Sequence, residues 1–119
     1  MHAGRDGLPV ASDTPGYLSR QTEWGDFNVA FETIAGGSDA TEPFSVLPDG
    51  RCQCPHWGYV IKGRLRIKYE DREETIEAGE AYYMEPGHIP VIEEDAELIE
   101  FSPRDEYKKT MEAMEALGD

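Results

Sequence analysis

The chain has 119 residues, the size of one domain with one hydrophobic core. Acidic residues outnumber basic residues by 25 to 11, and a formal charge of -14 repels phosphate backbones and anionic lipids, so we expect neither a nucleic-acid partner nor a membrane partner. No segment approaches the ~18 consecutive apolar residues of a membrane span, and the N-terminus lacks the apolar stretch of a signal peptide, so we expect a cytoplasmic protein.

Residues 1–16 are rich in Gly, Asp, Ser and Pro and have no apolar period, so we expect a flexible tail. Further along, β-rich runs lie between Gly, Pro and Asp turns, and each run predicts a strand. The predicted strands are 27–34, 43–47, 51–61, 65–69, 74–78, 81–84, 89–93 and 96–102. Short strands at ~8–12-residue spacing are typical of an all-β sandwich or barrel rather than of a βαβ fold.

Two hairpins are predicted within this β-rich region. Lys62-Gly63 separates two β-rich arms, and we expect a tight turn there, with Gly63 supplying the positive φ. A second, solvent-facing hairpin is predicted at a run of acidic residues. These are Glu93, Glu94, Asp95 and Glu97.

After Pro103 the pattern changes to good helix formers, with Tyr107, Met111 and Met114 at helical spacing. We expect residues 104–119 to form a helix that packs on the barrel or on a second subunit. The predicted organisation is therefore a tail (1–16), a β domain (17–103) and a C-terminal helix (104–119).

Cys52, Cys54 and His56 occupy alternate positions of a predicted strand, so their side chains are expected on one face. Thiolate and imidazole are favoured ligands of zinc, iron and copper. Alternate Cα atoms lie ~6.6 Å apart, which disfavours a disulfide and favours two ligands from this strand plus one from elsewhere. The alternative is plain core packing, because free cysteine behaves as a small hydrophobe.

Two motifs in the chain resemble those of the cupin family. Residues 52–63, Cys-x-Cys-Pro-His-x-Gly-Tyr-Val-x-x-Gly, look like its first motif, and residues 79–90 look like its second, with a Pro-Gly-His turn. The resemblance covers about residues 27–103 and implies a double-stranded β-helix, also called a jelly-roll barrel. His56 stands where the family has a Glu, and His88 lies two residues before the usual second-motif His position, with the same lumen-facing parity.

The resemblance implies a lumen site with His56, His88 and Cys54 as metal ligands, together with Cys52. Mixed thiolate and imidazole ligands favour zinc, with iron and copper next; the alternative is a metal-free barrel that binds an organic ligand. Tyr82 and Met84 share the parity of His88 and are expected to line the lumen and contact a small-molecule ligand. The resemblance also implies a homodimer through outer strands, and three outward-facing residues are consistent with it. These are Trp57, Tyr59 and Ile61.

Three functions remain open from the sequence. The first is a metal-dependent enzyme acting on a small molecule in the barrel lumen. The second is a non-catalytic ligand-binding or sensing module without metal. The third is a redox-sensitive protein, which needs Cys52 or Cys54 exposed and with a lowered thiol pKa.

Overall fold

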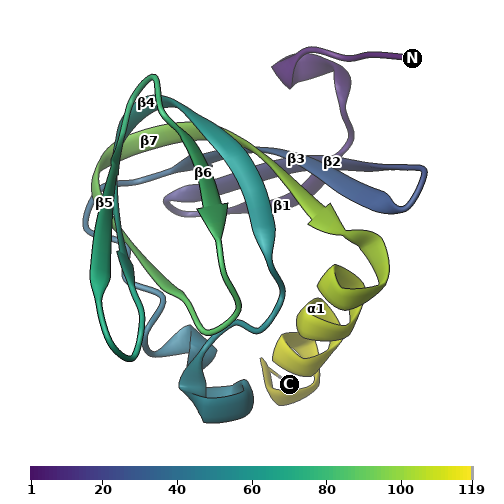
Figure 1. Ribbon diagram of the computed structural model, residues 1–119. Coiled ribbons are helices and arrows are strands. Elements are labelled where there is room, and N and C mark those ends of the chain that lie inside the picture. The colour runs from purple at the N-terminus through teal and green to yellow at the C-terminus, as the bar shows by residue number, and fades with distance from the viewer. Residues whose placement is uncertain (119) are drawn as a thin grey trace.

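The computed structural model describes residues 1–118, and within them the fold consists of seven antiparallel strands, three short 3-10 helices and one α-helix (Figure 1). The sheet order is β1-β2-β3-β7-β4-β5, and β6 pairs with β4. The strands are β1 (Val10–Thr14), β2 (Tyr17–Trp24), β3 (Phe27–Ile34), β4 (His56–Lys68), β5 (Glu73–Glu77), β6 (Ala81–Met84) and β7 (Ile89–Pro103). The all-β prediction with a C-terminal helix is confirmed.

The hairpin predicted at Lys62-Gly63 is wrong, because β4 continues through both residues as one strand. Gly63 does have a positive φ of 92°, but it serves a bend in the β4–β7 ladder, where the register shifts between Val60 and Leu65. A Cβ atom at position 63 would lie 2.3 Å from the carbonyl oxygen of Asp95. Glycine is therefore required here because β7 passes too close for a side chain.

The predicted acidic hairpin is also wrong, because residues 89–103 form the single strand β7. Two of its acidic residues, Glu93 and Glu94, form ion pairs with β4. Arg64 lies 3.5 Å from Glu93 and 3.2 Å from Glu94. Cross-strand pairs of opposite charge favour continued pairing over a turn.

Three segments differ from their predicted local structure. Part of the expected flexible tail forms β1, which pairs with β2, and Leu8 just before it is buried. The predicted strand 43–47 is instead a 3-10 helix, η2 (Pro43–Val46), and an extended Leu47. A second 3-10 helix, η3 (Pro48–Gly50), follows, and each begins with a proline that fixes the backbone. Residues 51–55 precede β4 as a loop, because its ladder begins only at His56.

The hydrophobic core fills the space between the inner faces of the strands. Its members are buried residues from four strands and the turns between them, such as Val60, Leu65 and Ile67 of β4. A second cluster lies beneath α1 (Arg104–Gly118), where Tyr107 and Met114 pack against Leu47 and the two cysteines. The helix therefore packs on the barrel, at the end where η2 and η3 also lie (Figure 1).

Asp119, the last residue of the predicted helical segment, lies outside the described residues. Within residues 1–118, no helix combines the length and apolar character that crossing a bilayer requires.

Candidate metal centre

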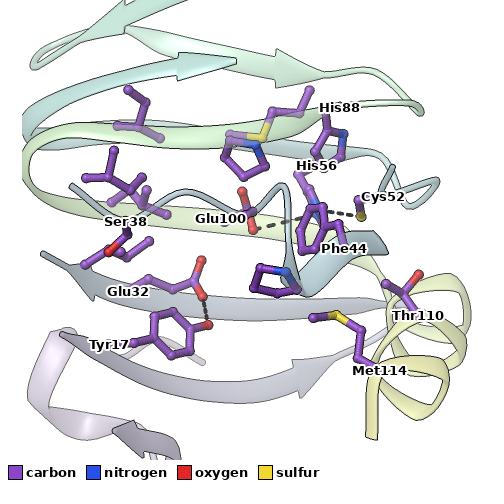
Figure 2. Close-up of a pocket in the computed structure, with 18 of the residues that line it drawn as sticks. Tyr17, Glu32, Ser38, Phe44, Cys52, His56, His88, Glu100, Thr110 and Met114 are labelled. Carbon is purple, nitrogen blue, oxygen red and sulfur yellow. Dashed lines mark hydrogen bonds and ion pairs between the residues drawn. The ribbon is translucent and has the colours of Figure 1, made fainter. Parts of the chain in front are cut away.

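A cavity of about 360 Å³ opens between the inner sheet faces, η2 and α1 (Figure 2). Its volume is within the range of small-molecule sites. The wall is mostly apolar, with polar groups contributed by several strands and loops. The lining includes Tyr17, Glu32, Ile34, Phe44, Cys52, His56, Met84, His88, Leu98, Glu100, Tyr107, Met111 and Met114.

Three separate segments bring Cys52, His56 and His88 to this cavity. His56 opens β4 and lies opposite Met84 of β6. Cys52 and His88 form an isolated bridge, in which the Cys52 amide donates to the His88 carbonyl at 3.1 Å. The amide of Gly87 donates back to the Cys52 carbonyl at 2.8 Å, so the Pro-Gly turn places the thiol beside the imidazole.

The three side chains present their donor atoms to a common point. One donor atom from each residue lies within 4.8 Å of the others, and all three residues are buried. Cys52 Sγ lies 3.7 Å from His56 Nε2, and the two imidazole centroids are 4.9 Å apart. Ordinary zinc–sulfur and zinc–nitrogen bonds at a tetrahedral angle place sulfur and nitrogen about 3.6 Å apart. The residues therefore fit a single ion.

Hydrogen bonds to the other ring nitrogen orient both histidines toward this point. His88 Nδ1 donates to the carbonyl of Glu85 at 2.7 Å, which leaves Nε2 as a lone-pair donor. His56 Nδ1 lies 2.6 Å from Ser102 Oγ, so its Nε2 faces Cys52. A hydrogen-bonded outer nitrogen is the usual support of a metal-binding histidine.

Burial keeps the three ligand candidates neutral. It lowers the pKa of His56 to about 4 and, together with the neighbouring His56, that of His88 to about 4. Burial raises the pKa of the Cys52 thiol to about 11. Neutral imidazoles are ready ligands, whereas the thiol must lose its proton when a metal binds.

Cys54, the other predicted thiol ligand, is not part of this group. Its Sγ donates to the Pro55 carbonyl at 3.5 Å, within the cluster under α1. The expectation that positions 52, 54 and 56 share one face is wrong because this segment is a loop rather than a strand. Burial raises the pKa of Cys54 to about 12, so neither thiol is the exposed thiolate that a redox sensor requires.

The two predicted ligand-contacting residues have different surroundings. Met84 lines the cavity. Tyr82 is buried in the core behind it, and its hydroxyl donates to Glu100 Oε1 at 2.8 Å. Tyr82 therefore positions a carboxyl group of the cavity wall.

Sequence reasoning missed two acids of the cavity wall, the half-buried Glu32 and the buried Glu100. Glu100 Oε2 lies 3.7 Å from His56 Nδ1, and Glu32 accepts a hydrogen bond from Tyr17 (Figure 2). Burial raises the pKa of Glu100, and burial together with the charge of Glu100 raises that of Glu32. The sequence pattern that could have revealed Glu100 is its position two residues from both Leu98 and Ser102, which puts all three on the inward face of the strand.

The antiparallel strands surround a cavity that His56 and His88 line, and solved structures of cupins have the same backbone arrangement. The backbone is similar to that of KdgF from Halomonas sp., with a TM-score of 0.59 and 20% identity over 83% of this chain and 91% of that chain. A cupin-2 domain protein from Shewanella frigidimarina matches with a TM-score of 0.53 and 22% identity over 72% of this chain and 79% of that chain.

The iron(II) form of HppE has a TM-score of 0.60 and 13% identity over 86% of this chain and 59% of that chain. No protein-family model and no curated protein sequence matches the chain. The structural similarities show that the protein has the cupin fold, which confirms the fold that the two sequence motifs implied.

Proposed function

We propose that the protein is a metal-dependent enzyme that binds one divalent ion on Cys52, His56 and His88 and converts a small molecule in the adjoining cavity. The observation that carries the proposal is the convergence of three buried donor atoms within 4.8 Å at the wall of a cavity. Three protein ligands beside open space are typical of catalytic rather than structural metal sites.

The donor set supports zinc first, with iron and copper next, because it combines one thiolate with two imidazoles. A bound ion would supply Lewis acidity at the buried end of the cavity. Glu100 is placed to accept or donate a proton there, since it lines the cavity and is fixed by Tyr82. A carboxyl group with a pKa raised toward neutrality is suited to both directions of proton transfer.

Metal titration of chelator-treated protein tests the proposal, with elemental analysis for zinc and charge-transfer absorption of added Co²⁺ as a report on thiolate ligation. We expect one ion per chain in the natural protein. Cys52→Ser, His56→Ala and His88→Ala should each lose stoichiometric binding. Cys54→Ser is the matched control, because it removes a buried thiol two residues away that lies outside the donor group.

A natural protein that takes up no stoichiometric metal would contradict the proposal. So would Cys52→Ser and His88→Ala variants that bind metal as tightly as the control. A non-catalytic binder without metal is the second candidate function, and the largely apolar cavity wall favours it. Its signature would be ligand binding to the metal-free protein that is unchanged in all three variants.

A further inference from the structure

Within residues 1–118, the wall of the cavity carries carboxyl groups but no lysine or arginine. Among the described residues that line it, three carry carboxyl groups, and none is Lys or Arg. The acids are Asp39, which is exposed, and Glu32 and Glu100, which lie deeper. A ligand in this cavity therefore meets acidic groups and no protein cation.

The strand register places Glu32 and Glu100 side by side. In the β3–β7 ladder Glu32 lies opposite Leu98, and Ala30 lies opposite Glu100, so the two acids are diagonal neighbours on the inner face. Diagonal neighbours of an antiparallel pair are about 7–8 Å apart, within reach of long side chains. Both carboxyl groups extend into the cavity (Figure 2).

The partners of these carboxyl groups within the protein are mainly neutral hydroxyls. Tyr17 donates to Oε2 of Glu32, and Tyr82 donates to Oε1 of Glu100. Glu100 also lies 3.7 Å from His56 Nδ1, a nitrogen that is already bonded to Ser102. Buried acids in proteins are normally matched by a cation. Here the cavity leaves room for a cation that the chain does not supply.

The remaining wall is suited to an apolar body. Phe44 of η2 and Met114 of α1 pack against the same small cluster. The apolar lining consists of these two residues together with Met111, Ile34 and Leu98. The cavity thus combines an acidic region with an apolar one. An amphiphile with a positively charged head matches both.

We propose that the substrate of this cavity is a small organic amine in its ammonium form, with the ammonium between Glu32 and Glu100 and the carbon chain against Phe44, Met111 and Met114. This inference rests on the proposed function, because it names the substrate class of the same site. An ammonium group can donate charge-assisted hydrogen bonds to both acids. A carboxylate or phosphate ligand would instead find, among the described lining residues, no Lys or Arg to pair with in a poorly solvated space.

Calorimetric titration of the chelator-treated, metal-free protein with three probes of equal chain length tests the inference, because an open zinc position would itself bind a carboxylate. The probes are n-butylammonium, n-butanol and butyrate. We expect the ammonium to bind about tenfold more tightly than the alcohol, and butyrate to bind more weakly than either. Glu32→Gln and Glu100→Gln should each reduce the preference for the ammonium. Glu97→Gln is the matched control, because it removes the same charge from the outer face of β7.

The rank order in the natural protein decides the question even if a Gln variant misfolds. Butyrate or butanol binding as tightly as butylammonium would overturn the inference, as would a preference that both Gln variants retain. Repeating the titration on His88→Ala separates this inference from the metal proposal. An ammonium preference without any metal binding would overturn only the proposed function, and metal binding without the preference would overturn only the substrate class.

Discussion

At the scale of single residues, the two histidines of the candidate site are held by short hydrogen bonds that the cysteine lacks. His56 is oriented by Ser102 from β7, 46 positions away in sequence, at 2.6 Å. His88 is oriented by the backbone of Glu85, within its own turn. The thiol of Cys52 has no comparable support, since its contacts with His56 Nε2 and the Cys54 carbonyl are both 3.7 Å. The histidines are therefore the preorganised part of the site.

Ser102→Ala tests this orientation. The variant removes the hydroxyl that lies against His56 Nδ1 but no ligand atom, so we expect zinc affinity to fall by about 10–100-fold while the fold is kept. Competition with a chromophoric chelator measures the affinity, and circular dichroism checks the fold. Ser45→Ala on η2 is the control, because its hydroxyl bonds only the backbone of Glu42. Equal affinity in Ser102→Ala and Ser45→Ala would contradict the role given to Ser102.

The buried acids predict how the stability of the metal-free protein depends on pH. The pKa of Glu32 in the folded protein is raised to about 8 and that of Glu100 to about 7, from 4.5 in the unfolded chain. The stability that these protonated acids contribute is therefore complete below pH 4.5 and is lost as the pH rises through 7 and 8. The two histidines change stability in the opposite direction, because their pKa is about 4 in the folded protein and 6.5 in the unfolded chain. The stability that the neutral imidazoles contribute is complete only above pH 6.5. Unfolded histidines are half protonated at pH 6.5, so a remaining gain of about 0.4 kcal/mol per histidine offsets part of the loss from the acids up to about pH 7.5.

We therefore expect the free energy of unfolding to fall by about 1–2 kcal/mol between pH 6.5 and 8.5, after allowance for solvent screening at the partly exposed Glu32. Urea denaturation in the presence of a chelator measures this change. Glu100→Gln should flatten the dependence, whereas Glu97→Gln should leave it unchanged. Stability that rises over this interval would show that the acids are ionised in the folded protein.

At the scale of elements, the sequence patterns predicted most strands and the two histidines but not the long strands that organise the sheet. Gly63 signals a positive φ, yet a glycine that permits a turn and one that permits close strand passage look the same in sequence. The distinction depends on β7, more than 30 positions away. The same limit explains Cys54, whose orientation is set by a loop that ends where the ladder begins at His56.

Local patterns also missed the pairing of β1 and the inward orientation of Glu32 and Glu100. Strand pairing of the N-terminal segment is a tertiary contact, and a polar segment without apolar alternation gives no local sign of it. Whether an acid faces the lumen depends on which face of the strand is buried, and that is known only once the register is fixed.

Gly63→Ala tests the account of the long strand β4. Its added Cβ would meet the Asp95 carbonyl at 2.3 Å in addition to the strain of a φ of 92°. Gly79→Ala is the matched control, because φ is 90° there and no atom lies within 4 Å of the added Cβ. We expect about 1–2 kcal/mol of destabilisation for the control and about 1–3 kcal/mol more for Gly63→Ala. If the two variants lost equal free energy of unfolding in urea denaturation, backbone strain alone, without close packing against β7, would explain why position 63 requires glycine.

At the scale of the whole molecule, one sheet face carries an exposed apolar surface opposite the cavity. Trp57 of β4 stacks on Tyr83 of β6 at 5.1 Å, and Phe27 of β3 meets the Trp57 ring edge-on at 6.2 Å. Trp57 is 42% exposed and Tyr83 46%. We call this the outer aromatic patch, and its members are Phe27, Trp57, Tyr59, Ile61, Tyr83 and Phe101. A contiguous apolar surface of this kind is a common mark of association.

We predict that the outer aromatic patch joins two copies of the chain, as the sequence-based expectation of a homodimer requires. Each copy carries a formal charge of -14, so the apolar contact must overcome repulsion, and association should strengthen as salt screens it. Sedimentation velocity at low and physiological ionic strength measures this association.

Tyr83→Lys should shift the population to monomer despite reducing the net negative charge, because it places an ammonium within the patch. Val46→Lys makes the same charge change at an exposed apolar residue of η2, outside the patch, and should remain dimeric. A natural protein that sediments as a monomer at both ionic strengths would exclude this interface.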